Sequence, residues 1–510
     1  MSKRRAEEEE DTESGVSQST PLKNGEREGV KGVENEDSQM GEFEDPYEDE
    51  FESENEVEED EIIELVDEDE GEATAESNAV SEHKPDKKEG PRIFLPNLDQ
   101  LGKDEILEPD PTVYEMLHRI NLNWPCLSFD ILADNLGEER RDYPKTTYFV
   151  ASTQAKRKKE NEITVIKLTD LSKTLENDSD DENEVDEDAV DSDPVLESRS
   201  LPTVDTTNRI RVSPHAANTG EYLTASLSEC GDVYIWDLSP HMNAFNTPGA
   251  SITKAQNRPV HTIRAHGGVE GYAVDWSPHA VSGQLLTGDV TGRIHLTTRG
   301  TSNWTTDKTP FMGHEDGASV EEIQWSQSEK SVFASGGSDG YIRVWDVRSK
   351  KHKPALSVFA SSSDVNVMSW SKSVSYLLAS GHDDGSWGIW DLRTFTGSSN
   401  GANIQPAASF SFNKSPITSI EFHPTEESVV AVSSADNTVM LWDLSVEADD
   451  EEIAMQKRQD SAGQLDNIPA QLLFVHWQRD VKEVHWHKQI PGMLMSTGGD
   501  GMSVWKSISV

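Results

Sequence analysis

Two short patterns in the sequence have residue types that could support catalysis. Gly336–Gly340 (GGSDG) spells GxSxG, a turn that presents a serine nucleophile when it joins a strand to a helix. Here the pattern lies between two strand-like segments, so we predict a structural turn. His485 and His487 alternate on one predicted strand, but no HExxH, paired CxxC or P-loop pattern accompanies them. The sequence therefore predicts a protein that is not an enzyme and that holds no metal or other cofactor.

Acidic side chains are the other chemically distinctive residues, and they are unevenly distributed. The 510 residues include 95 Asp and Glu against 45 Lys and Arg, a formal net charge of −50. Residues 1–90 hold 34 acids and 9 bases, and Thr174–Glu197 holds 12 acids and no base. Without these two segments, 36 bases face 49 acids, a net charge of −13. The extreme charge is therefore appended to a mildly acidic fold.

This charge distribution bounds the partners of the protein. A strongly negative field repels nucleic acid and attracts basic proteins, so we expect no direct binding of nucleic acid. Only Cys126 and Cys230 are present, and no run of about 20 apolar residues occurs, so we expect a soluble intracellular protein with no membrane partner. We predict disorder for residues 1–94 and 174–197, because such segments bury too little apolar surface to fold.

Repeats organise the chain from about Arg209 onward. One mark is an aromatic or apolar strand end followed by Ser or His, as in Trp276-Ser277 and Trp370-Ser371. The second mark is Trp-Asp, found at Trp236-Asp237, Trp345-Asp346, Trp390-Asp391 and Trp442-Asp443, with a bare Trp505 in the last copy. These marks resemble WD40 repeats, whose unit of about 40–45 residues is one four-stranded blade of a β-propeller.

The fourth repeat carries the most specific part of this resemblance. Four of its residues resemble the WD40 tetrad that joins the loop before a blade, its second strand, its tight turn and its third strand: His314, Ser335, Asp339 and Trp345. Cys230 and Thr291 stand at the turn position in the second and third blades. We therefore expect incomplete networks in those two blades.

A closed ring needs one blade more than the six visible copies. Thr146–Ser152 and Ile163–Leu168 alternate like strands, so we assign the first blade to Tyr143–Leu171. Leu127–Leu132 is predicted to be a strand that pairs with the last blade and closes the ring. The predicted fold is all-β: a seven-bladed WD40 β-propeller over residues 127–510, preceded by an α-helix and acting as a monomer.

That helix is predicted within residues 95–126, which we interpret as a linker and a helix packed on the last blade. Asp110 is a good N-cap with Pro111 at the first helical position, and Thr112 with Glu115 would form a capping box. Apolar residues follow at helical spacing and should pack on the propeller: Val113, Met116, Leu117 and Ile120. Tyr114 and His118 would then lie on the exposed face.

The stretch Tyr114–Leu132 is similar to the N-terminal segment of the histone-binding WD-repeat proteins of chromatin-assembly and deacetylase complexes. In those proteins a basic histone helix binds between the N-terminal helix and an acidic loop that connects the last two blades. Residues 445–470 resemble that loop, although Ile468-Pro469 replaces a Pro pair. The resemblance implies that the client-binding residues are Tyr114, His118, Asp449, Asp450, Glu451 and Glu452.

The acidic N-terminal region and the acidic insertion in the first blade bring the resemblance closer to the glutamate-rich WD-repeat proteins, which are ribosome-assembly factors. This resemblance covers residues 95–510. It implies a chaperone that receives ribosomal protein three of the large subunit and delivers it to early nucleolar pre-60S particles. We accordingly expect the protein in the nucleus and nucleolus, and in the cytoplasm while it carries its client.

Smaller signals concern transport and modification. Lys156, Arg157, Lys158 and Lys159 form either a nuclear-import signal or a solvated hairpin tip. Ser179 precedes the acidic tract Asp180, Asp181 and Glu182, which is typical of a site for an acidophilic kinase. Phosphate there would add about 1.5–2 negative charges, so its effect should be graded.

Two alternative functions stay open. The first is a histone chaperone or chromatin-assembly subunit that binds core histones, because the predicted helix and acidic loop resemble that family too. The second is a substrate receptor of a cullin ubiquitin ligase. Trp345–Arg348 and Trp390–Arg393 both match the WDxR pattern that docks on the adaptor of such ligases.

Overall fold

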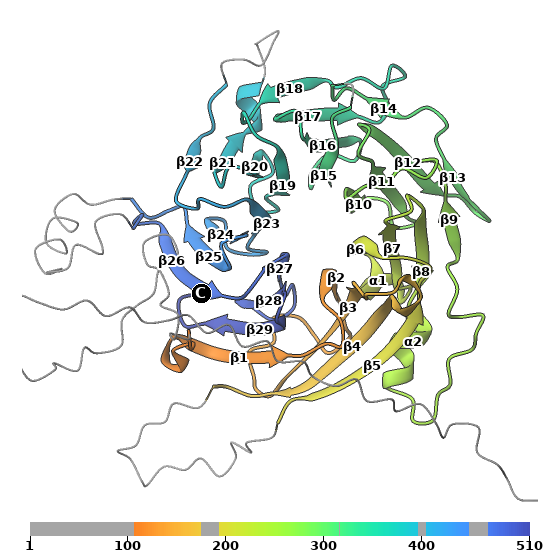
Figure 1. Ribbon diagram of the computed structural model, residues 1–510, viewed down its shortest axis with the longest axis vertical. Helices are drawn as coiled ribbons and strands as arrows, with labels where there is room; N and C mark the ends of the chain where they lie inside the picture. Colours follow the sequence, from red (N-terminus) through yellow and green to blue (C-terminus); the bar gives the residue numbers. More distant parts are fainter. Residues whose placement is uncertain (1–106, 175–192, 316, 396–403, 448–467) are drawn as a thin grey trace, which may run out of the picture. The chain divides into compact units, whose positions relative to one another are not determined.

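Seven antiparallel sheets surround a central axis in the computed structural model (Figure 1). It describes residues 107–174, 193–315, 317–395, 404–447 and 468–510. Each sheet runs from an inner strand beside the axis to an outer strand at the rim, and we number these blades in chain order. The arrangement confirms the predicted all-β, seven-bladed β-propeller. The predicted disordered region 1–94 lies outside the described residues.

The first three blades follow one another along the chain. Blade 1 contains β2 (Cys126–Leu132), β3 (Lys145–Thr153), β4 (Glu162–Leu171) and β5 (Val195–Pro202), with η2 (Lys158–Glu160) between β3 and β4. Blade 2 contains β6 (Thr207–Val212), β7 (Leu223–Ser228), β8 (Val233–Asp237) and β9 (His261–Ile263), with α1 (Ala216–Thr219) and α2 (Ser239–Phe245) in its connections. Blade 3 contains β10 (Val274–Trp276), β11 (Gln284–Gly288), β12 (Arg293–Arg299), β13 (Trp304–Thr306) and β14 (Phe311–Met312).

The next three blades carry the clearest repeats. Blade 4 contains β15 (Val320–Trp325), β16 (Val332–Gly337), β17 (Tyr341–Asp346) and β18 (Leu356–Phe359). Blade 5 contains β19 (Val365–Trp370), β20 (Leu377–His382), β21 (Trp387–Asp391) and β22 (Ala408–Phe410), with η3 (Leu392–Phe395) after β21. Blade 6 contains β23 (Ile417–Phe422), β24 (Val429–Ser434), β25 (Thr438–Asp443) and β26 (Leu472–Trp477).

Blade 7 joins the two ends of the described chain. Its inner strands are β27 (Glu483–Trp486), β28 (Met493–Gly498) and β29 (Gly501–Ser507), and its outer strand is β1 (Tyr114–Ile120). β1 pairs with β29 from Tyr114↔Ser507 to Ile120↔Met502. The prediction that Leu127–Leu132 closes the ring was wrong, because this segment is the inner strand of blade 1 and pairs with β3. The strand that closes the ring is β1.

The predicted N-terminal α-helix is also wrong for Asp110–Ile120. The capping signal is real but supports only one 3-10 turn, η1 (Pro111–Val113), in which Asp110 accepts a hydrogen bond from the Thr112 amide at 3.0 Å. The chain then becomes β1, because the edge of β29 offers backbone partners along its length. Tertiary pairing of this kind overrides local helix preference.

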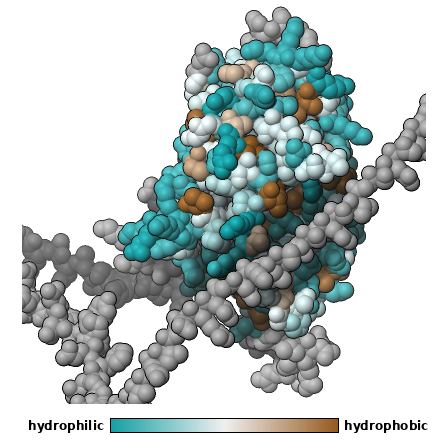
Figure 2. Space-filling model, turned by 90° about the vertical axis from the view of Figure 1, so that its right-hand side faces the viewer, coloured by the Kyte–Doolittle hydropathy of each residue, from teal (hydrophilic) through white to brown (hydrophobic). Residues whose placement is uncertain are grey.

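Apolar side chains pack between neighbouring blades, and the outer rim is polar. The largest fully buried side chains are mostly strand tryptophans: Trp325, Trp345, Trp387, Trp390, Trp442, Trp486 and Trp505. The rim beside β9 and β13 is largely hydrophilic, with separated apolar side chains (Figure 2). The prediction of a disordered insertion at residues 174–197 needs correction at its end, because β5 begins at Val195 and pairs with β4. Residues 175–192 lie outside the described residues.

Candidate protein-binding site

The candidate site is the outer side of the ring closure, where β1, Ser172–Thr174 and β26 meet. We call these three segments the closure seam. β1 is held on one side by β29, and its other edge carries Thr174. The amide of Leu117 donates to Thr174 Oγ1 at 3.0 Å, and the amide of Thr174 donates to the carbonyl oxygen of Glu115 at 3.0 Å. The residue that precedes the acidic insertion of blade 1 is therefore attached to β1.

Tyr114 belongs to the core of the seam and is not exposed, contrary to the prediction. Its side chain is 7% exposed and its hydroxyl lies 2.9 Å from Nδ1 of His476. Its ring meets that of Phe474 edge to face at 5.2 Å. Burial raises the pKa of Tyr114 and lowers the pKa of His476 to about 3, so the pair is neutral. Tyr114 thus joins blade 6 to blade 7 and offers no surface to a client.

His118 is half-buried, and its position differs from the predicted exposed one as well. Its Nε2 lies 2.9 Å from the carbonyl oxygen of Ser172. Burial lowers the pKa of the imidazole, so the neutral form is favoured. His118 therefore holds the start of the blade 1 insertion against β1, and a role in client contact would have to be indirect.

The described part of the seam also contains basic groups. Lys506 Nζ lies 2.7 Å from a carboxylate oxygen of Glu115. Burial opposes the charge of Glu115, but the hydrogen bond and the charge of Lys506 outweigh it and lower the pKa of Glu115. Burial lowers the pKa of the nearby Lys145 to about 8, and its ammonium lies 4.2 Å from the centre of the Tyr143 ring.

The acidic insertion of blade 6 leaves and re-enters the fold beside the same seam. Gln471 Nε2 donates to the carbonyl oxygen of Val446 at 2.9 Å, which ties together the two ends of the insertion. β26 follows at once, and its Phe474 packs on Tyr114. Asp449, Asp450, Glu451 and Glu452 lie outside the described residues, as do Ser179, Asp180, Asp181 and Glu182.

The seam therefore gathers the attachment points of three acidic segments. Residues 1–106 lead into β1, residues 175–192 follow Thr174, and residues 448–467 lie between Glu447 and Ile468. Sequence reasoning located the segments but not their common origin. The available signal was the last repeat, which supplies only three strands before the chain ends and so needs a fourth from elsewhere.

The tetrad residues of blade 4 come together as one hydrogen-bonded network. His314 Nε2 lies 2.8 Å from Ser335 Oγ, and His314 Nδ1 lies 3.0 Å from Asp339 Oδ1. The indole of Trp345 donates to Ser335 Oγ at 2.9 Å. The GxSxG segment is the turn between β16 and β17, and Ser338 Oγ accepts the amide of Ser319 at 2.8 Å.

Blade 3 has a fuller network than its sequence predicted. His266 lies 2.8 Å from both Asp289 and Thr287, so Asp289 fills the role expected two residues later. The amide of Thr291 donates to Asp289 at 2.9 Å. In blade 2 the Cys230 thiol donates to Ser228 Oγ at 3.4 Å, and Cys230 makes no acidic pair there.

Two further predicted sites lie on exposed turns. Lys156–Lys159 is exposed at the tip between β3 and β4, where Lys158 pairs with Asp205 at 2.8 Å. In the two WDxR segments, Arg348 and Arg393 each form an ion pair with their own aspartate, Asp346 at 2.7 Å and Asp391 at 2.6 Å. Both arginines thus bind inside their own turn.

Within the described residues there is no group of three or more His, Cys, Asp or Glu side chains placed to hold a metal ion. His485, one of the two predicted metal candidates, instead lies 2.8 Å from Glu421. No helix in the same part of the chain is long and apolar enough to span a membrane.

The fold and the seam define a WD40 β-propeller that carries acidic segments on one closure. Models of two known families match this chain. The family of histone-binding protein RBBP4 and its counterpart in the CAF1 complex matches residues 104–172, and the WD domain, G-beta repeat, matches residues 305–346 and 404–443.

Full-length relatives make the assignment more specific. The chain is 46% identical to ribosome assembly protein rrb1 of Schizosaccharomyces pombe, over all of both chains. It is 41% identical to glutamate-rich WD repeat-containing protein 1 of Dictyostelium discoideum, over 82% of this chain and 85% of that one. It is 42% identical to protein HEAT STRESS TOLERANT DWD 1 of Arabidopsis thaliana, over 81% and 90%. This chain belongs to the family of glutamate-rich WD-repeat and ribosome assembly proteins.

Proposed function

We propose that this protein is a non-enzymatic ribosome assembly factor that chaperones a basic protein of the large ribosomal subunit. Its client is ribosomal protein three, which it delivers to early pre-60S particles in the nucleolus. The observation that carries this proposal is the gathering of three acidic segments at the closure seam of a rigid propeller. Similarity to a ribosome assembly protein over the whole chain supports it.

The physical basis is competition with RNA for basic side chains. A ribosomal protein exposes Lys and Arg that later contact phosphates, and free carboxylates can screen them in the meantime. Each exposed charge contact contributes only about 0.2–1 kcal/mol, so retention needs many contacts. Because contacts between exposed charges are screened by salt, the client can pass to a denser polyanion.

The test is the affinity of the full chain for the purified ribosomal protein at moderate salt. The variant D449N/D450N should weaken binding by about 2-fold to 30-fold, because it removes two charge contacts. E426Q/E427Q is the matched control, since it neutralises two exposed acids of the same blade outside the acidic insertion. We expect its affinity to stay within about twofold of the wild type. Equal affinities in all three proteins, or the absence of ribosomal proteins among co-purified clients, would contradict the proposal.

A second candidate function is histone binding, and the match of residues 104–172 to a histone-binding family favours it. In the present structure residues 107–120 of that match lead into and form β1, so any histone contact would have to use the seam in another way. Competition between a core histone and the ribosomal protein for the full chain distinguishes the two candidates. Tight histone binding that is lost in D449N/D450N while ribosomal-protein binding survives would favour the second.

A further inference from the structure

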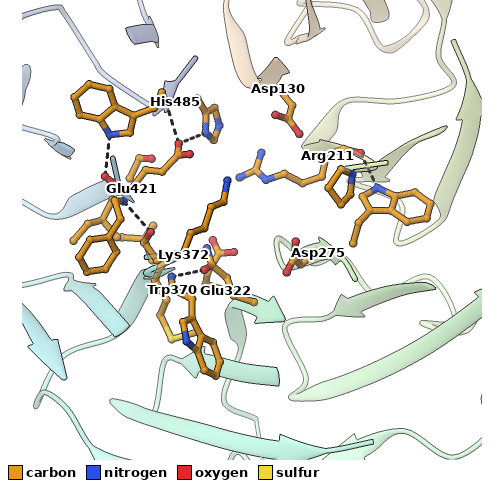
Figure 3. Close-up of a pocket in the computed structure, with 18 of the residues that line it drawn as sticks. Asp130, Arg211, Asp275, Glu322, Trp370, Lys372, Glu421 and His485 are labelled. Carbon is orange, nitrogen blue, oxygen red and sulfur yellow. Dashed lines mark hydrogen bonds and ion pairs between the residues drawn. The ribbon is translucent and has the colours of Figure 1, made fainter. Parts of the chain in front are cut away.

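One polar ring lines the central channel, with one residue from the inner strand of each blade (Figure 3). In blade order these residues are Asp130, Arg211, Asp275, Gln324, Ser369, Glu421 and His485. Ring members accept backbone hydrogen bonds from the next blade. Asp275 accepts the amide of Trp325 at 2.7 Å, and Gln324 accepts that of Trp370 at 2.7 Å. Equivalent bonds link Asp130 to Val212, Ser369 to Phe422, and Glu421 to Trp486. The ring acids are therefore occupied in joining blades.

The basic members of the ring are occupied as well. Arg211 lies 3.2 Å from Glu483, which also binds Arg209 at 2.8 Å. His485 lies between Glu421 at 2.8 Å and Glu483 at 3.4 Å. Burial opposes a charge on His485, but the hydrogen bonds to the two glutamates outweigh it and raise its pKa to about 9. Positive and negative groups at this depth thus balance one another.

The mouth of the channel beside this ring differs. The residues three positions beyond each ring member are Ala133, Pro214, Pro278, Gln327, Lys372, Pro424 and Lys488. Only Lys372 and Lys488 are charged, and both side chains are exposed to solvent. Among the described residues, no carboxylate lies within ion-pair distance of either ammonium. The charge of Lys488, followed by burial, lowers the pKa of Lys372 to about 8.

Two like charges thus face one cavity of about 180 Å³, and Lys372 extends into its centre (Figure 3). That volume is about six times the share of one water molecule in the liquid, so a phosphate or carboxylate group fits. An oxyanion between the lysines would remove their repulsion and accept charge-assisted hydrogen bonds from both. We propose that Lys372 and Lys488 form an oxyanion-binding site at this mouth of the channel, for a phosphate or carboxylate group. The site is independent of the proposed function.

The chemistry leaves two sources for the oxyanion. One is a free phosphate-type anion. The other is a carboxylate of this chain, because β25 runs parallel to β23 and therefore ends on the lysine side of blade 6, between the blades that carry Lys372 and Lys488. The acidic run Asp449–Glu452 follows β25 within nine residues.

The experiment uses the full chain with ¹³C-dimethylated lysines, followed by NMR while inorganic phosphate is added at constant ionic strength. The Lys372 and Lys488 resonances should shift together and saturate. In K372Q the dissociation constant read from Lys488 should rise about tenfold, and the same should hold for K488Q read from Lys372, since one hydrogen bond to a charged group contributes about that factor. K482Q is the matched control, because Lys482 is exposed at the opposite end of β27. It should leave the constant unchanged.

A second variant separates the two sources. If phosphate binds more tightly to D449N/D450N/E451Q/E452Q than to the wild type, carboxylates of the chain compete for the site, which supports it. Equal, saturable binding to both proteins supports a free anion. No saturable shift in either protein overturns the proposal, and so does a shift that persists unchanged in K372Q and K488Q.

Discussion

Blades 4 and 6 place a tryptophan at the same position of the third strand but satisfy it differently. In blade 4 the indole of Trp345 donates to Ser335 Oγ, which is bound in turn by His314. In blade 6 the residue ten positions before Trp442 is Val432, which has no hydroxyl. The buried indole N–H of Trp442 has no hydrogen-bond partner among the described residues.

Blade 6 relies on aromatic packing in place of the polar network. The Trp442 ring lies 5.3 Å from Trp387 and 5.1 Å from Phe410. Asn413 donates to Asp436 at 3.1 Å, but neither reaches the tryptophan. Aromatic pairs contribute about 0.5–1.5 kcal/mol beyond their buried area, which offsets part of the cost of the unpaired N–H. The comparison shows that a Trp-Asp mark fixes the place of a blade and not the chemistry that holds it.

The largest expected effect is removal of either tryptophan. W345A and W442A should each lower the free energy of unfolding by about 3–5 kcal/mol, because each empties a fully buried site. Phenylalanine should separate the two blades. W345F also gives up the hydrogen bond to Ser335 and should lose about 1–3 kcal/mol more than W442F, which has no such bond to lose. Urea unfolding followed by far-UV circular dichroism measures this, and equal losses for the two phenylalanine variants would contradict the comparison.

The next effect concerns acid stability through Asp339. Burial opposes its charge, but the hydrogen bond from His314, with the charges of His314 and Arg343, lowers the pKa of Asp339 to about 2. A lowered pKa stabilises the fold above the unfolded value of about 3.9, and this stabilisation is lost as the pH falls towards 2. D339N should therefore cost about 2 kcal/mol at neutral pH and flatten the loss of stability between about pH 4 and pH 2.

The matched control for D339N is D436N in blade 6. Asp436 is bound by Asn413 and Thr438, which are neutral, so its replacement should cost less than that of Asp339. Unfolding midpoints across the acid range measure both variants. An acid limb in D339N as steep as that of the wild type would show that blade 4 is not held by the charge of Asp339.

The blades were predictable because each repeat carries its own marks, and β1 was not because its pattern is misleading. A bulge between Tyr114 and Met116 shifts the register, and both faces of the strand are buried. Met116 packs towards blade 1 and Leu117 towards the cluster shared by blades 6 and 7. A strand with two buried faces and a bulge loses its alternation of period two, so its apolar residues imitate helical spacing.

The seam and the channel mouth differ in how far sequence could reach. Lys372 and Lys488 occupy one repeat position, so alignment of the repeats alone can find them. The contact of Thr174 with β1 and that of Phe474 with Tyr114 join segments far apart in sequence, with no repeat to relate them. Tertiary pairing creates these contacts, and local patterns carry no trace of them.

The smallest effect tests whether the missing hydroxyl alone distinguishes the two blades. In V432T a hydroxyl replaces a methyl group at the position that Ser335 holds in blade 4, and it can accept the Trp442 N–H. The hydrogen bond of about 1 kcal/mol should offset the cost of burying the hydroxyl, so the free energy of unfolding should change by less than about 1 kcal/mol. V439T is the control, because Val439 is fully buried in an apolar cluster of the same blade. There the hydroxyl should cost about 1–3 kcal/mol. Equal losses in V432T and V439T would mean that the aromatic packing of blade 6 holds Trp442 out of reach of residue 432, and that the two blades differ in geometry as well as in chemistry.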